Sequence, residues 1–304
     1  MSRLSYVTVD VFTDSPFGGN PLAVVFGGET LSGSQMQTLA REFNLSETVF
    51  VLPAEKPGGA ARLRIFTPAV ELPFAGHPTV GTAYVLAARG AVDHDASTST
   101  LTLEENIGDI EVRVSCQDGA VIACQLTAAQ APEARQVELG PETIAEVLSL
   151  EGDAVRTDDL APVATSAGFP FLYVPLVDRA EVARASLDWQ AWETHLRGSW
   201  ADNVFLFAMD GADTDVHARM FGPSVGVPED PATGAAATGL AGVLGAADPR
   251  VDGTLEWSVA QGVEMGRPSR MNIEADKVDG RVVRVRVGGA SVPISEGTVT
   301  IPAL

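Results

Sequence analysis

The spacing of apolar and polar positions predicts many short strands and a few helices. In the first half, alternating or continuously apolar runs bounded by Gly, Pro and Asn predict strands over residues 5–12, 22–26, 48–52, 61–67 and several more between 100 and 126. Helical spacing after Ser32 or Ser34 predicts a helix over 34–43. Pro78 suits the first turn of a small-residue helix that would run to Ala88 and end at Gly90.

The second half of the chain has a similar pattern. It predicts helices near 189–196 and 231–244. It also predicts strands near 171–176, 203–208, 216–221, 254–259, 270–275, 282–287 and 298–301. Many short strands with a few helices are typical of an α+β fold.

A motif in the first half recurs in the second. The segment Arg64-x-Phe66-x-Pro68-x-Val70-x-x-Pro73 reappears 155 residues later as Arg219-x-Phe221-x-Pro223-x-Val225-x-x-Pro228, and the same offset places Glu47 over Asp202. After a slip of two residues, the segment from His77 to Gly81 matches the segment from Asp230 to Gly234. Convergent turn chemistry is the alternative, but we interpret the pattern as two copies of one supersecondary unit.

These copies predict two pseudo-symmetric lobes, each with a curved, barrel-like sheet around a central small-residue helix. The expected N-terminal lobe covers residues 1–128 and the C-terminal lobe 129–304, joined by a polar linker over 127–136. The return of the last strand, near 290–304, to the first lobe is an alternative to this division.

Composition narrows the class of protein. The formal net charge of -20 argues against a nucleic-acid partner. The sequence has no run of about 20 apolar residues for a membrane span and no signal peptide at its start, so we expect a soluble, cytoplasmic protein without a membrane partner. Four scattered histidines offer no metal-ligand spacing. No dinucleotide or phosphate-binding motif is present, and neither a metal nor a cofactor is expected.

The two cysteines are expected to be free thiols in the core. The stretch 111–126 is typical of a hairpin with Asp118-Gly119 at its turn. That turn pairs Gln117 with Ala120 and places Cys124 opposite Arg113, so that Cys116 and Cys124 do not face each other.

Two loops that lead into small-residue helices are the candidate sites of chemistry. A helix start offers unpaired N–H groups and a partial positive charge, and two of them could grip a carboxylate. His77 and Asp230 lie at matching positions before Pro, where each could move a proton or simply cap its helix. Glu47 alone has the character of an exposed loop acid. Glu104 and Glu105 are expected at the surface of a strand.

Five segments together resemble the PhzF-like phenazine biosynthesis family, within the diaminopimelate epimerase fold, over essentially the whole chain. They are 9–25, Asn44-Leu-Ser-Glu-Thr-Val-Phe50, Phe74-Ala-Gly-His-Pro-Thr-Val-Gly81, Glu229-Asp-Pro-Ala-Thr-Gly-Ala235 and Gln261-Gly-Val-Glu-Met-Gly-Arg-Pro-Ser269. The resemblance implies a homodimer, with a site in the cleft between the lobes. It also implies that Glu47 is the general acid/base, with His77 and Asp230 as partners. Characterised phenazine-pathway members isomerise trans-2,3-dihydro-3-hydroxyanthranilate by moving a proton between ring carbons without a cofactor.

The leading hypothesis is therefore a cofactor-independent isomerase that moves a proton on a small carboxylate substrate. The residues expected to contact this substrate are Asn20, Gly76, Thr79, Gly81, Thr233, Gly234, Ala235, Gln261 and Gly262. Ala235 departs from the family pattern, which often has Ser at this position. The missing hydroxyl is expected to change which substrate binds more than which type of reaction is catalysed. The alternatives are an epimerase or racemase of a small amino or hydroxy acid, and a non-catalytic metabolite-binding protein.

Overall fold

The computed structural model describes residues 3–209 and 212–302. Within these ranges the chain forms two compact units. The first unit comprises residues 3–129 and 288–302, and the second unit comprises residues 130–287. The last strand, β18 (Ser291–Thr300), belongs to the first unit, where it pairs antiparallel with β1 (Arg3–Val11).

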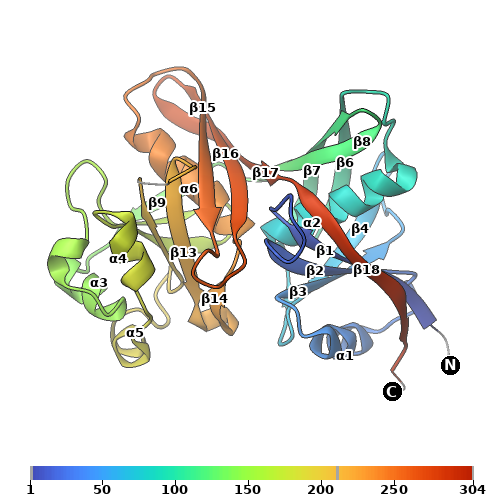
Figure 1. Ribbon diagram of the computed structural model, residues 1–304, viewed down its shortest axis with the longest axis horizontal. Helices are drawn as coiled ribbons and strands as arrows, with labels where there is room; N and C mark the ends of the chain where they lie inside the picture. The colour runs from blue at the N-terminus through green and yellow to red at the C-terminus, as the bar shows by residue number, and fades with distance from the viewer. Residues whose placement is uncertain (1–2, 210–211, 303–304) are drawn as a thin grey trace. The chain divides into compact units, whose positions relative to one another are not determined.

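The first unit is one mixed sheet around a buried helix (Figure 1). Its strands follow the order β18, β1, β2, β3, β4, β6, β7 and β8. The bounds not yet given are β2 (Asn20–Phe26), β3 (Glu47–Leu52), β4 (Ala61–Phe66), β6 (Thr98–Glu105), β7 (Gly108–Gln117) and β8 (Ala120–Thr127). The short β5 (Glu71–Leu72) pairs with β4.

The helix α2 (Gly76–Leu86) lies at the centre of this sheet. It contacts β1, β2, β3, β6, β7 and β8, and all its residues but Tyr84 and Leu86 are buried. A helix that is apolar on every side is stable only when surrounded by protein, which explains its central place. A turn of π-helix (Ala87–Ala91) ends it, with Gly90 at φ 91°. The other helix, α1 (Gly33–Phe43), begins at a capping box formed by Ser32 and Gln35.

The second unit repeats the strand order of the first. Strands β10 (Val163–Ser166), β11 (Pro170–Pro175), β12 (Val204–Ala208), β13 (Val216–Gly222), β15 (Gly253–Gln261) and β16 (Ser269–Val278) are neighbours in that order. Their pairings alternate between antiparallel and parallel in the same sequence as β1, β2, β3, β4, β6 and β7. The repeat found in the sequence is thus also a repeat of sheet topology, and the α+β fold class is confirmed.

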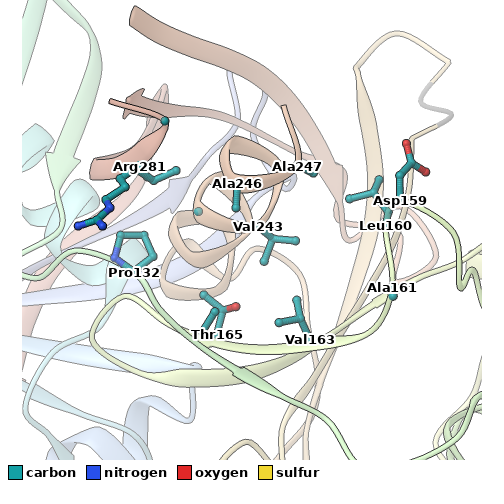
Figure 2. A pocket seen from close by; sticks show the side chains of 14 residues that line it. Pro132, Asp159, Leu160, Ala161, Val163, Thr165, Val243, Ala246, Ala247 and Arg281 are labelled. Atoms are coloured by element: carbon teal, nitrogen blue, oxygen red, sulfur yellow. The ribbon is translucent and has the colours of Figure 1, made fainter. Parts of the chain in front are cut away.

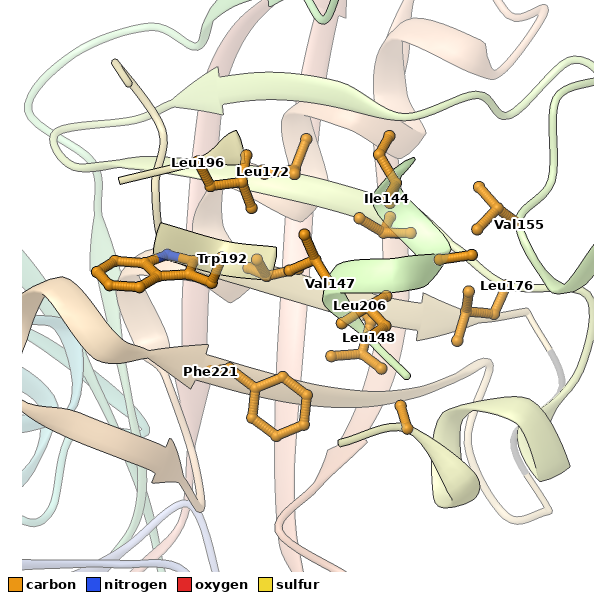
Figure 3. Packing of buried hydrophobic residues seen from close by; sticks show 14 of the residues in the cluster. Ile144, Val147, Leu148, Val155, Leu172, Leu176, Trp192, Leu196, Leu206 and Phe221 are labelled. Atoms are coloured by element: carbon orange, nitrogen blue, oxygen red, sulfur yellow. The ribbon is translucent and has the colours of Figure 1, made fainter. Parts of the chain in front are cut away.

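The remaining elements of the second unit complete this pattern. They are β9 (Glu133–Gln136), α3 (Pro141–Val147), α4 (Arg179–Arg184), α5 (Trp189–His195), β14 (Val227–Asp230), α6 (Gly234–Ala247) and β17 (Arg281–Gly289). The central helix is α6, which contacts β10, β11, β15 and β16. Figure 3 shows the core on the other face of the strands from α6, where side chains of α3 and α5, among them Ile144 and Trp192, pack with Leu172 and Leu206 of the strands.

Two local predictions need correction, and two helices were not predicted. A bulge between Ser115 and Cys116 shifts the hairpin register, so that Cys124 pairs with Val114 and not with Arg113; both thiols are free and buried. The end of the predicted linker is the strand β9, paired with β10. The helices α3 and α4 were not predicted; the structure shows them as helices of 7 and 6 residues.

Candidate active site

The first unit brings Asn20, Glu47 and His77 together at one edge of its sheet. Strands β2 and β3 are parallel, with Leu22 opposite Glu47, so Asn20 and Glu47 lie at the same end of neighbouring strands. His77 is the second residue of α2. Sequence positions 20, 47 and 77 thus meet because of strand order and not because of local spacing.

His77 is a neutral imidazole held from both sides. It is 3% exposed, and burial lowers its pKa to about 3. Its Nδ1 lies 3.1 Å from the side-chain nitrogen of Asn20, and its Nε2 lies 3.3 Å from Oε2 of Glu47. An amide nitrogen only donates, so Nδ1 accepts and the ring proton is on Nε2, the ring nitrogen that lies 3.3 Å from the Glu47 carboxylate without an aligned hydrogen bond.

Glu47 is the outermost member of this trio. Its side chain is 14% exposed, whereas that of His77 is 4% exposed and Asn20 is fully buried. The order from inside to outside is amide, imidazole, carboxylate. The carboxylate thus keeps some solvent exposure while it lies beside a buried imidazole.

Neither α2 nor α6 has a side chain capping its start among the described residues. By contrast, Ser32 caps α1, Asp178 caps α4 and Asp188 caps α5. His77 and Asp230 are therefore not helix caps. The first N–H groups of a helix have no partner within it, so these two starts can receive an anion.

In the second unit, Asp230, Thr233 and Gln261 form a hydrogen-bonded cluster. The Thr233 hydroxyl donates to Oδ2 of Asp230 at 2.6 Å. The Gln261 amide nitrogen donates to the Asp230 carbonyl oxygen at 2.7 Å, and its oxygen accepts the Thr233 N–H at 3.2 Å. Gln261 is fully buried, so it fixes the loop that leads into α6.

The loop after Gln261 is braced as well. Gly262 has a φ of 73°, and a Cβ there would lie 2.5 Å from the carbonyl oxygens of both Pro231 and Arg267. Two residues on, Oε1 of Glu264 lies 2.7 Å from Nε2 of His217, which is 1% exposed. The backbone geometry of this loop therefore requires glycine at position 262, independently of any contact with substrate.

The other predicted contact residues lie in the first turns of the two central helices or just inside them. Gly76 begins α2 and Gly234 begins α6. Thr79 is fully buried and donates to the Ala75 carbonyl oxygen at 2.7 Å. Gly81 lies deeper, against the side chains of Val11 and Leu22. Ala235 is the partly exposed residue of the first turn of α6.

Asp202 does not repeat the geometry of Glu47. Its Oδ2 accepts the N–H of Gly198, and its Oδ1 accepts from the side chain of Asn203. The internal repeat thus keeps the sheet but not the acid–imidazole pair. In this part of the chain the acid has become a loop-bracing residue.

Two buried acids were missed by the sequence analysis. Glu104 is 3% exposed and Glu105 is 6% exposed, although both were expected at the surface. Glu104 accepts the backbone N–H groups of Glu55 and Lys56 at 2.8 and 2.9 Å. The alternation of apolar residues in β6 was the signal in the sequence that could have revealed their burial. It places adjacent residues on opposite faces of the strand, and one of these faces packs towards α2.

The second unit also has a pocket of about 500 Å³, shown in Figure 2. It is lined by residues of α6 such as Val243 and Ala246, together with Thr165, Asp159 and Arg281. None of the predicted site residues lines it. Over residues 3–209 and 212–302, no group of three or more His, Cys, Asp or Glu side chains could hold a metal ion. No helix in those ranges is long and apolar enough to cross a membrane.

Solved structures share this repeated fold over nearly the whole chain. One is a probable proline racemase from Agrobacterium radiobacter, with a TM-score of 0.67 at 15% identity, covering 98% of this chain and 93% of that chain. A PhzF-family phenazine biosynthesis protein from Bacillus anthracis has a TM-score of 0.87 at 26% identity, covering 99% of this chain and 100% of that chain.

The family follows from the sequence comparisons. The family model described as "Phenazine biosynthesis-like protein" matches residues 9–297. An uncharacterized isomerase from Mesorhizobium japonicum is 39% identical over 99% of this chain and 100% of its own length. A trans-2,3-dihydro-3-hydroxyanthranilate isomerase from Pseudomonas aeruginosa is 38% identical over 96% and 98%. The chain belongs to the phenazine biosynthesis-like (PhzF) family, a family of isomerases.

Proposed function

We propose that the protein is a cofactor-independent isomerase in which Glu47 moves a proton on a small carboxylate substrate. The observation that carries this proposal is the 3.3 Å contact between Oε2 of Glu47 and Nε2 of a neutral, buried His77. The contact orients the carboxylate without a full ion pair, which leaves it able to accept a proton from carbon.

The proton transfer follows from this geometry. Glu47 takes a proton from a carbon made acidic by its neighbouring groups, and then returns it to another carbon of the same substrate. His77 keeps its Nε2–H throughout, because Asn20 donates to Nδ1. The uncapped N–H groups at the start of α2, the helix that carries His77, favour the substrate carboxylate and the charge that develops beside it.

The loop of Asp230 has a positioning role in this proposal. Thr233 and Gln261 fix the Asp230 carboxylate and backbone, as their hydrogen bonds support. Ala235 presents a methyl group on the first turn of α6 where family members often present a hydroxyl. We therefore propose a substrate of the same class as trans-2,3-dihydro-3-hydroxyanthranilate, with that compound as the first to test.

The test is proton NMR of turnover in deuterated buffer. Wild type is expected to convert the substrate, and Glu47→Gln to lose at least about 10³-fold in kcat while its Kd for substrate changes little, since the base is lost and the shape is kept. Asp202→Asn is the matched control, because Asp202 is the repeat partner of Glu47 and braces a loop. Full activity of Glu47→Gln would remove Glu47 from the mechanism.

An epimerase or racemase is the second candidate. A predicted epimerase from Pseudomonas aeruginosa has a TM-score of 0.81 at 29% identity, covering 98% of this chain and 99% of that chain. The same NMR experiment separates the two reactions: inversion with deuterium at a single carbon indicates an epimerase, and transfer between two carbons indicates a proton-shift isomerase. If wild type and Glu47→Gln bind the substrate equally well and neither exchanges a substrate proton for deuterium, the protein is a metabolite-binding protein.

We also propose that the enzyme is a homodimer, as the family resemblance implies. Light scattering of the purified protein at several concentrations tests this. A mass near twice 31.7 kDa is expected, and a mass of one chain at every concentration would refute it.

A further inference from the structure

Glu105 is a buried acid that touches the helix carrying His77. It is the last residue of β6, which contacts α2. Its Oε1 lies 2.6 Å from the hydroxyl oxygen of Thr79, two residues after His77. Glu105 is 6% exposed and Thr79 is fully buried, so no solvent separates them.

The number of protons needed at this contact indicates whether Glu105 is ionised or neutral. The Thr79 hydroxyl oxygen also lies 2.7 Å from the Ala75 carbonyl oxygen, which can only accept. A hydroxyl has one proton, so it cannot donate to both oxygens, and the Ala75 oxygen has no proton to give. The 2.6 Å contact with Glu105 then needs a second proton, which a neutral carboxylic acid supplies.

The surroundings of Glu105 favour the neutral acid. Its Oε2 is buried and has no hydrogen-bond partner among the described residues. An ionised oxygen left in that state costs far more than a carbonyl oxygen. Burial raises the pKa of Glu105 to about 8, against smaller lowering effects of Thr79 and Arg62.

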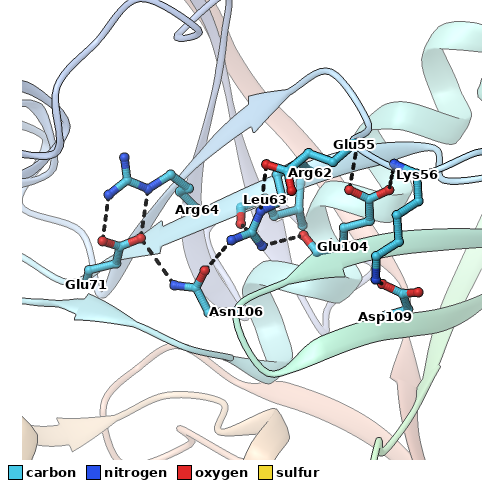
Figure 4. Close-up of polar contacts among 9 residues, drawn as sticks. All are labelled: Glu55, Lys56, Arg62, Leu63, Arg64, Glu71, Glu104, Asn106 and Asp109. Carbon is cyan, nitrogen blue, oxygen red and sulfur yellow. Dashed lines mark hydrogen bonds and ion pairs between the residues drawn. The ribbon is translucent and has the colours of Figure 1, made fainter.

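Charged groups on the neighbouring elements have other partners. Figure 4 shows Arg62 of β4 donating to the Glu104 carbonyl oxygen and to Asn106. On the other face of β6, the Glu104 carboxylate accepts from the backbone, as described above.

The remaining charged groups on these elements are paired, neutral or, like Glu111 and Arg113 of β7, exposed to solvent. Lys56 pairs with Asp109 of β7, and Arg64 of β4 pairs with Glu71. On α2, His77 is neutral. The carboxylate of Glu47, on β3, lies 3.3 Å from His77.

We propose that Glu105 is a positioning residue that, as a neutral acid, donates to Thr79 and fixes the first turn of α2, and that its ionisation weakens substrate binding. This proposal rests on the proposed function. When Glu105 loses its proton, Thr79 must turn its own proton to the carboxylate and release Ala75. The new negative charge at the start of α2 then competes with the substrate carboxylate for the N–H groups of Gly76 and His77.

The test is the pH dependence of KM and kcat between pH 6 and 10. In wild type we expect KM to rise roughly 3- to 30-fold through pH 8 with a smaller change in kcat, as a charge near a helix start acts mainly on anion binding. Glu105→Gln donates without ionising, so its KM should stay flat, whereas Glu105→Leu should have a raised KM at every pH. Glu111→Gln, an exposed acid on β7, is the charge-matched control. An identical alkaline rise in wild type and Glu105→Gln would overturn the proposal.

A second measurement does not depend on turnover. The folded pKa of Glu105 is raised above the unfolded value, so the wild type should lose stability relative to Glu105→Gln as pH rises from about 4.5 to about 8. Urea unfolding of both forms across this range measures the difference. A difference that does not change with pH means that Glu105 is ionised in the fold and overturns the proposal, whether or not Glu47 is the catalytic base.

Discussion

At the residue scale, the site depends on the environment of side chains and not on their type. His77 has an ordinary imidazole, but burial keeps it neutral. Glu47 and Asp202 are matched acids of one repeat, yet only Glu47 faces an imidazole. Sequence comparison of the two copies could pair these acids but could not distinguish their roles, because the difference lies in what each carboxylate meets after folding.

The depressed pKa of His77 predicts acid sensitivity. Its folded pKa lies below its unfolded value of 6.5, so the unfolded chain takes up a proton that the folded chain refuses. Stability should fall as pH drops from about 6.5 towards 3, by up to about 1.4 kcal/mol per pH unit from this group. Urea unfolding at several pH values measures the slope.

His77→Gln should flatten this slope, while His195→Gln should not, because the side chain of His195 is 31% exposed. An unchanged slope in His77→Gln would mean that His77 is protonated in the fold.

At the element scale, the parts of the site were predictable where a local rule governs them. The apolar, small-residue composition of α2 and α6 gave the two central helices, and the Gly- and Pro-containing loops gave their starts within three residues. The burial of Glu104 and Glu105 was not predictable in this way, since β6 meets α2 only after strands distant in sequence have paired.

The loop after β15 gives a prediction at this scale. Gly262→Ala should destabilise the protein by about 1–3 kcal/mol and reduce turnover, because its φ of 73° is unfavourable and its Cβ would meet two carbonyl oxygens. Thermal unfolding and initial rates measure both effects.

Gly266→Ala is the matched control within the same loop. Its φ is 70°, but no atom lies within 4 Å of the added Cβ, so it carries the backbone penalty without the clash. Equal losses in the two variants would show that close approach to Pro231 and Arg267 plays no part.

At the scale of the whole molecule, the 155-residue offset predicted the repeated topology because sheet order follows from repeated strand and turn signals. The register of individual hairpins did not follow, since one bulge at Ser115 moves every later pair. The charge of -20 is likewise a property of the whole chain.

This charge predicts that salt stabilises the fold. Repulsion among like charges acts over about 30 Å at 0.01 M salt and about 10 Å at 0.1 M. We expect Tm to rise by roughly 2–4 °C for each kcal/mol of repulsion removed between 10 and 200 mM NaCl. Equal effects of NaCl and KCl would identify screening, and a fall in Tm would show that attractive surface pairs dominate.

The return of β18 to the first unit has a consequence for how the chain is made. Synthesis proceeds from the N-terminus, so residues 130–287 leave the ribosome as one continuous piece and can fold on emergence. The unit that contains Glu47 and His77 lacks the strand beside β1 until residues 291–300 are released. A ribosome that stops early would therefore deliver a chain with an open edge at β1, a ready substrate for cellular proteases, and only finished translation would close the sheet that contains the proposed base.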